Sequence, residues 1–196
     1  MPVAPLRQPR DKVPRMHIRN TTQSFGLLSK LLHWVTAFLI LALIALGYYM
    51  VGLTYYDPWY HDSLQTHKAL GMVVFVLGLS TLVWRWVSPS PPLQSTLKPW
   101  ERMAATAMHH TLFLLVLLMP LTGFLVSTSQ GSAVEFFDFF EVPALLVVGE
   151  GLRDLAIQVH FYCTYGTGGL VALHAAAAIK HQILDRHDTL ARMLWQ

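Results

Sequence analysis

The chain of 196 residues is 54% hydrophobic, and only 13% of its residues are charged. A soluble domain carries about 25% charged residues, so this composition excludes one and indicates an integral protein of the lipid bilayer, short enough for one domain. The net charge of +3 at pH 7 does not call for nucleic acid as a partner, because membrane topology explains the basic residues. The single cysteine, Cys163, excludes a disulfide within the chain.

Residues 1–24 are expected to form a flexible basic tail, followed by a membrane domain at residues 25–196. The tail lacks the short apolar run and small-residue cleavage site of a removed signal peptide. Its basic residues are Arg7, Arg10, Lys12, Arg15 and Arg19.

Four mainly apolar segments follow, each long enough to cross about 30 Å of hydrocarbon as a helix. We place these spans at about residues 28–53, 64–87, 101–128 and 155–184, with a kink at Pro120 in the third. The connection SAVEFFDFFEVP, residues 132–143, is expected to form a short helix at the membrane surface.

The distribution of Lys and Arg predicts the orientation. With four spans, the second loop and both termini share one side, and all but two of the 14 Lys and Arg residues lie there. Only Lys68 and Arg153 lie opposite. Because cytoplasmic loops hold the excess of basic residues, we expect an all-α four-helix bundle with both termini in the cytoplasm.

The last span carries two histidines, His160 and His174, fourteen residues apart. Fourteen residues of α-helix are close to four turns, about 21 Å, so the two rings return to nearly the same face. An ionisable residue in a membrane helix usually faces the bundle interior and marks a pathway or a ligand. For a single histidine, a hydrogen bond to a neighbouring helix is an equally good interpretation.

Matching depths in the other spans favour the ligand interpretation. His67 begins the second span on the outer side, as His160 begins the fourth, while His33 and His174 lie near the inner side. Two such imidazole pairs suit bis-histidine haem, whereas zinc prefers three or four donors at one depth. No C-x-x-C-H motif occurs, which excludes covalent haem attachment.

Glycines lie beside these histidines in the sequence. They provide either room for porphyrin faces or close packing between helices. The residues are Gly71, Gly166, Gly168 and Gly169.

Five motifs give the chain a family resemblance: LLHW, THKALGM, HHTLFLLVLLMPLTG, LHAAAAIKH and the terminal DTLARML. The chain resembles the prokaryotic cytochrome b561 family of four-helix, di-haem membrane cytochromes, and within it the superoxide oxidase members, over about residues 25–194. The resemblance implies two haem b groups held by His33, His67, His160 and His174. It also implies a multi-pass protein of the bacterial inner membrane that passes electrons from superoxide to ubiquinone.

Other residues are candidates for the inner side of this site. His109 is an alternative ligand of the inner iron, in place of His33 or His174; otherwise His109 or His110 contacts a haem propionate or a quinone pocket. His181 is the candidate for hydrogen-bonding a quinone or passing protons to it, with Lys98 as a neighbour. An ordinary interfacial histidine is the alternative for His181. We interpret His17, His61 and His187 as surface residues.

Lys68 and Arg153 are candidates for a donor site on the outer side, because both lie close in sequence to the predicted outer ligands. Pairing with haem propionates is the alternative role. The outer connections are otherwise acidic, which does not suit efficient collection of an anion such as superoxide. Their acidic residues are Asp57, Asp62, Glu135, Asp138, Glu141, Glu150 and Asp154.

The sequence hypothesis is a superoxide:ubiquinone oxidoreductase that moves single electrons through two haems to quinone on the cytoplasmic side. The first alternative is the cytochrome b electron-transfer or anchor subunit of a membrane dehydrogenase or hydrogenase, with a redox partner protein at the periplasmic face. The second alternative is a histidine-lined metal or proton transporter without haem.

Overall fold

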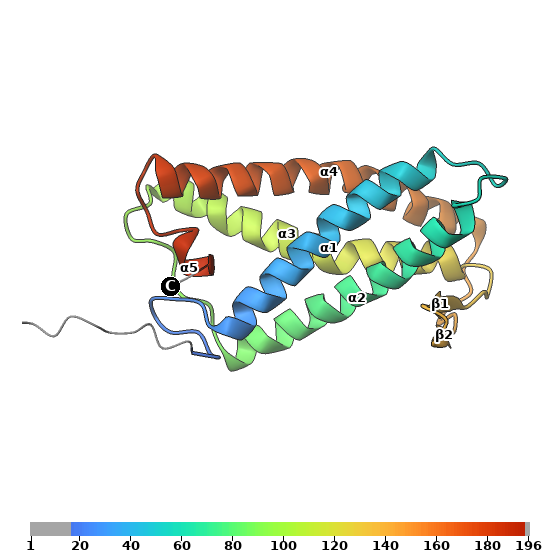
Figure 1. The fold of residues 1–196 in the computed structure, drawn as a ribbon, viewed down its shortest axis with the longest axis horizontal. Helices are drawn as coiled ribbons and strands as arrows, with labels where there is room; N and C mark the ends of the chain where they lie inside the picture. Colours follow the sequence, from blue (N-terminus) through green and yellow to red (C-terminus); the bar gives the residue numbers. More distant parts are fainter. Residues whose placement is uncertain (1–16, 195–196) are drawn as a thin grey trace, which may run out of the picture.

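The computed structural model describes residues 17–194, and nearly all of its regular structure is helical (Figure 1). Residues 1–16, most of the expected tail, lie outside the described part. The long helices lie where the sequence predicts the four spans. The elements are α1 (Leu27–Val51), α2 (Tyr60–Val87), α3 (Pro99–Thr128), β1 (Val134–Phe136), β2 (Phe140–Val142), α4 (Glu150–Ile183) and α5 (Ala191–Leu194).

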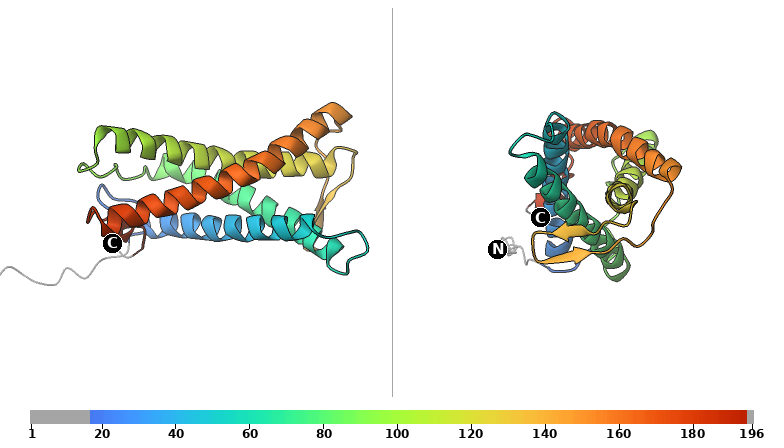
Figure 2. Two further views of the ribbon diagram at one scale, coloured as in Figure 1. Left: turned by 90° about the horizontal axis from the view of Figure 1, so that it is seen from above. Right: turned by 90° about the vertical axis from the view of Figure 1, so that its right-hand side faces the viewer.

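The long helices run alternately in opposite directions (Figures 1 and 2). Helix α1 packs beside α2, α2 beside α3, and α3 beside α4. Both ends of the described chain lie at one end of the molecule, together with the α2–α3 connection (Figure 1). We call this the tail end. The opposite end carries β1 and β2 and is called the hairpin end.

Part of the expected tail is held against the helices. Asn20 donates two hydrogen bonds to Ser88. Its backbone nitrogen donates to Ser88 Oγ at 2.8 Å, and its Nδ2 donates to the Ser88 carbonyl at 2.9 Å. Its Oδ1 accepts from the Gly26 backbone nitrogen at 2.8 Å, just before α1 begins. Asn20 therefore joins the start of α1 to the end of α2.

Within the described residues, three helices are long and apolar enough to span a membrane by length and composition: α1, α2 and α3. The fourth predicted span is present as α4, a helix of 34 residues, but it is not apolar enough to count with them. Its three histidines, its glycines and its tyrosines lower its mean hydropathy. The structure therefore describes a helical membrane protein, and composition alone does not make α4 a span.

The prediction of a surface helix at residues 132–143 is wrong. The segment forms an antiparallel hairpin in which Phe136 pairs with Phe140. Phe137 and Asp138 have φ of 46° and 60°, and the Phe139 nitrogen donates to the Phe136 carbonyl at 2.9 Å. Two successive positive φ angles are typical of the type I′ turns that join paired strands, and Val and Phe suit strands.

The contact between α2 and α3 is close at Gly78. Gly78 is buried on α2, and a Cβ atom added there would lie 2.9 Å from both Val116 Cγ1 and Leu117 Cδ2 of α3. Such distances are shorter than normal van der Waals contact, so the close approach of these helices depends on the missing side chain.

Gly78→Leu should therefore lower stability, by about 1–3 kcal/mol for overpacking. Thermal unfolding in detergent, followed by circular dichroism, measures the change. Gly151→Leu in the first turn of α4 is the matched control, because a Cβ there meets no heavy atom within 4 Å. Equal unfolding temperatures for the two variants would contradict the packing argument.

Candidate functional site

A cavity of about 1800 Å³ lies among the long helices. Ligand pockets for small molecules are typically about 300–1,000 Å³, so this space exceeds what one such ligand needs. Histidines of all four long helices line it: His33 of α1, His67 of α2, His109 of α3, and His160 and His174 of α4.

At the hairpin end of the cavity, the rings of His67 and His160 face each other with centroids 6.2 Å apart and planes at 70°. This is the pair that the sequence expects on the outer side. His67 Nδ1 is buried and has no hydrogen-bond partner within residues 17–194. A buried nitrogen without a partner is costly, so His67 is suited to binding a group that enters the cavity.

The structure fixes the orientation of His160. Its Nδ1 lies 3.1 Å from the Met119 carbonyl and 3.0 Å from Thr122 Oγ1. A carbonyl oxygen only accepts, so we assign the proton to Nδ1, which leaves the Nε2 lone pair free for a metal. Sequence patterns could not predict this contact, because it joins α3 to α4 across 41 residues.

Two glycines make room for the same pair of rings. A Cβ at Gly47 of α1 would lie 3.3 Å from His67 Cε1, and one at Gly123 of α3 would lie 3.1 Å from His160 Cε1. Each imidazole is thus backed by the bare backbone of a neighbouring helix. Neither glycine was among those expected from the sequence.

The expected glycines lie in open space. A Cβ at any of them meets no heavy atom within 4 Å, so they are not sites of close helix packing. Three of them, Gly71, Gly168 and Gly169, line the cavity, whereas Gly166 is absent from its lining.

Nearer the tail end, the His33 and His174 rings have centroids 6.4 Å apart and planes at 66°. His109 also reaches His174, with centroids 5.4 Å apart. The structure therefore brings together the expected inner pair and the alternative ligand.

The ring distances test which metal geometry fits. A ligating imidazole nitrogen lies about 2 Å from its metal and about 1.1 Å from the ring centre, so two ligands on opposite sides place their centroids about 6.3 Å apart. Two ligands at a tetrahedral angle place them about 5 Å apart. The pairs at 6.2 and 6.4 Å match opposite ligation, as in bis-histidine haem.

The number of donors supports the same geometry. Within residues 17–194, the only group of three or more His, Cys, Asp or Glu residues with all ligand atoms within 4.8 Å of one another is His181, Asp185 and His187, which shares no residue with the two ring pairs. The histidines of the two ring pairs thus belong to no compact three-donor cluster, so their arrangement would suit haem better than a zinc site.

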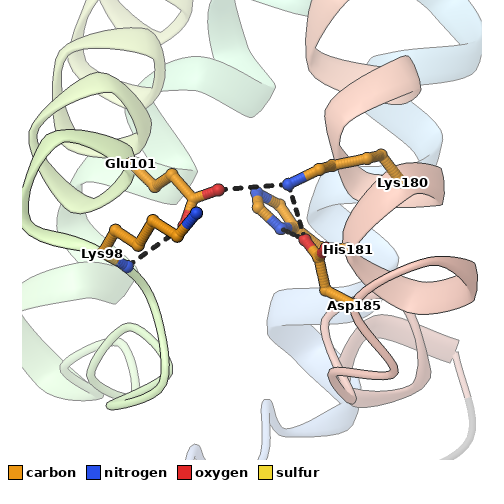
Figure 3. A network of polar contacts seen from close by, with 5 residues as sticks. All are labelled: Lys98, Glu101, Lys180, His181 and Asp185. Atoms are coloured by element: carbon orange, nitrogen blue, oxygen red, sulfur yellow. Dashed lines mark hydrogen bonds and ion pairs between the residues drawn. The ribbon is translucent and has the colours of Figure 1, made fainter.

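The tail end of the cavity carries a polar network (Figure 3). Lys180 Nζ lies 3.1 Å from Glu101 Oε1 and 2.7 Å from Asp185 Oδ2, and His181 Nδ1 lies 2.6 Å from the same Asp185 oxygen. Glu101, Lys180 and His181 line the cavity. Hydrogen bonds from Lys180 and then His181 lower the pKa of Asp185, so this carboxylate stays charged at neutral pH.

Lys98 does not take the place expected for it beside His181. Its side chain is exposed and absent from the cavity lining, and only its backbone nitrogen joins the network, donating to Glu101 Oε2 at 3.0 Å (Figure 3). The ammonium group next to His181 belongs to Lys180 instead. The register of α4 supplies the reason, since Lys180 precedes His181 and Asp185 follows it by four residues.

The two outer candidates differ in position. Lys68 lines the cavity one residue after His67, whereas Arg153 is half-buried and absent from the lining.

Among the remaining histidines, His17 and His61 are exposed as expected, but Nδ1 of His187 is buried. The surface interpretation of His187 was incomplete for that reason. His110 is exposed, and its Nδ1 lies 2.7 Å from the Thr106 carbonyl.

Long apolar helices around a cavity with paired imidazoles define a helical membrane protein suited to holding planar metal cofactors. The family model for prokaryotic cytochrome b561 matches residues 24–196, and the chain belongs to that family. The expected resemblance is thus confirmed. The family binds haem b and transfers electrons across membranes through it.

Relatives support the assignment over most of their length. The chain is 36% identical over 179 residues to cytochrome b561 homolog 2 of Escherichia coli (strain K12), covering 91% of this chain and 95% of the relative. It is 28% identical over 169 residues to cytochrome b561 homolog 1 of the same strain, covering 83% and 92%. It is 24% identical over 168 residues to the probable superoxide oxidase CybB of Yersinia pestis, covering 83% and 91%.

The Gly123 contact yields a test of the cavity geometry. Gly123→Val should push the His160 ring out of place and lower the haem content of the purified protein, because a haem that His160 would hold loses that contact. Pyridine haemochrome analysis measures haem per chain. Gly166→Val is the matched control on α4, since a Cβ there meets nothing within 4 Å. An unchanged haem content in Gly123→Val would contradict the role of this glycine.

Proposed function

We propose that this chain binds two haem b groups, one between His67 and His160 and one between His33 and His174, and moves single electrons between the two faces of a bacterial inner membrane. The two ring distances of 6.2 and 6.4 Å are the observation that carries the proposal. The 5.4 Å separation of His109 and His174 fits opposite ligation less well, which favours His33 as the inner ligand.

In this proposal α4 is the fourth span and both termini are cytoplasmic, so the tail end is the inner end. The packing of α1 on α2, α2 on α3 and α3 on α4 supports four spans, and both ends of the described chain lie at one end of the molecule. The excess of Lys and Arg in the segments of that end supports the orientation.

Bound haem b would supply reversible one-electron chemistry. The chain's residues set its place and surroundings. Met119 and Thr122 hold the His160 ring in one tautomer, and the bare backbones of Gly47 and Gly123 leave room for the two outer rings. Ordered ligand rings reduce the rearrangement that each electron transfer requires.

Quinone is the proposed acceptor at the inner end, with ubiquinone as the leading candidate. Reduction of a quinone to a quinol takes up protons, and the network of Glu101, Lys180, His181 and Asp185 places one imidazole, that of His181, beside the cavity where it can pass them on. His181 is the proposed proton donor or hydrogen-bond partner of the quinone, because it lines the cavity and Asp185 orients its ring.

Superoxide is the proposed donor at the outer end. The resemblance to superoxide oxidases supports it, and Lys68 beside His67 supplies a positive charge at the cavity wall. Superoxide only loses an electron in this reaction, so no general base is needed at that end. The chain would then act as a superoxide:ubiquinone oxidoreductase.

One observation favours a second function. The hairpin register places Glu135 directly opposite Glu141, with Asp138 at the turn between them. Like charges opposite each other in a hairpin are unfavourable, so this acidic surface suits a cationic partner. A cytochrome b subunit that accepts electrons from a docked dehydrogenase or hydrogenase subunit is the alternative.

Histidine replacement tests the proposed ligands. His67→Ala and His160→Ala should each reduce the haem content from two to about one per chain, with loss of the outer haem, because each removes one of the two residues that would hold it. Reduced-minus-oxidised spectra and pyridine haemochrome analysis measure this. His61→Ala is the control, since this exposed histidine lies outside the cavity lining. Selective loss of the inner haem would overturn the pairing.

The donor is tested on the intact protein in detergent. Superoxide should reduce both haems, and a soluble quinone analogue should then reoxidise them. Two haems that do not respond to superoxide would keep the haem architecture and move the donor to a partner protein. A folded preparation without haem would overturn the proposed function as a whole.

A further inference from the structure

A second cluster of ligand-type side chains lies where α4 ends. His181, Asp185 and His187 each offer one ligand atom, and these atoms all lie within 4.8 Å of one another. None of them belongs to the histidine pairs of the cavity. We propose that they form a binding site for a divalent transition-metal ion such as Zn²⁺, separate from the haem sites, and that a bound ion would compete with the quinone role proposed for His181.

The backbone is folded so as to bring the two histidines together. Arg186 has a φ of 56°, a left-handed conformation that a non-glycine residue seldom adopts, and the His187 nitrogen donates to the His181 carbonyl at 2.8 Å. The chain thus reverses immediately after α4. Residue 187 returns beside residue 181, and the two rings lie nearly parallel with centroids 5.8 Å apart.

The donor atoms are suited to a metal. His187 Nδ1 is buried and has no hydrogen-bond partner within residues 17–194, whereas a buried imidazole nitrogen normally has one. Two imidazoles and one carboxylate form a ligand set that Zn²⁺ commonly accepts, with water in the fourth position. The side chains of His181 and Asp185 are 15% and 27% exposed, so an ion can reach them.

The present spacing requires a small adjustment. Ligand atoms of a tetrahedral zinc ion lie about 3.4 Å apart, given bonds of about 2.0–2.1 Å. His181 Nδ1 and Asp185 Oδ2 are now hydrogen-bonded at 2.6 Å and would separate slightly. The His187 ring would turn toward them, because parallel rings cannot both hold one ion in their planes.

Lys180 is the internal competitor for this site. Its ammonium lies 2.7 Å from the same Asp185 oxygen that the metal would bind, and it also contacts Glu101 at 3.1 Å (Figure 3). Metal binding would therefore displace Lys180 from Asp185 and leave it paired with Glu101. Removal of the ammonium should tighten metal binding.

Isothermal titration of Zn²⁺ into the haem-loaded protein, purified in detergent without a histidine tag, tests the site. We expect one saturable site, weakened at least tenfold in His187→Ala and in Asp185→Ala, unchanged in His61→Ala, and strengthened in Lys180→Met. The haem spectrum of each sample shows that the cavity pairs remain intact. Binding to these variants is read without any activity measurement, so the result does not depend on the proposed electron transfer.

The opposite outcomes are equally clear. No saturable binding, or an affinity in both His187→Ala and Asp185→Ala equal to that of the unaltered chain, would overturn the proposed metal site. Unchanged affinity in Lys180→Met would show that Asp185 Oδ2 does not bind the ion, which also contradicts it.

Discussion

The structure depends on one constraint: an imidazole placed inside an apolar helix bundle needs a partner for its nitrogens. At His160 the protein supplies a partner for Nδ1 through Met119 and Thr122, and it directs the rest of the ring toward His67. The missing side chain at Gly123 and the open cavity follow from that need. Each of these imidazoles has a second nitrogen, and a filled core would leave no space for a group bound to it. The helices accordingly enclose a cavity where the histidines lie close together.

Sequence spacing predicted the helices and the recurrence of His160 and His174 on one face, because both follow from a fixed periodicity along a single helix. Contacts between helices do not follow from it. Gly47 and Gly123 back the His67 and His160 rings, yet the sequence pointed to Gly71 and Gly168, which are nearer to the histidines along the chain. Which glycine meets a ring depends on where two helices cross, and that crossing leaves no pattern in either segment alone.

The hairpin and the inner network show two other limits. Phe137 and Asp138 adopt positive φ without a glycine, so the usual sequence indication of a type I′ turn is absent. At the tail end, Lys98 of the proline-rich connection before α3 was expected as a neighbour of His181. Lys180 of α4 takes this position instead. Lys98 lies at the start of α3, where only its backbone nitrogen contacts the network, through Glu101.

Helix α4 carries one histidine of each ring pair, His160 near the hairpin end and His174 nearer the tail end. It is also the long helix that its composition does not mark as a membrane span. These two facts have one cause. Residues that line the cavity recur on α4 at intervals of three or four: His160, Thr164, Gly168, Val171, His174 and Ala178. Four of the six are polar or lack a side chain, as a cofactor-facing surface would require, and hydropathy averages that surface with the rest of the helix. In a helix that serves a buried site, low mean hydropathy therefore reflects the chemistry of one face and is compatible with a position inside the membrane.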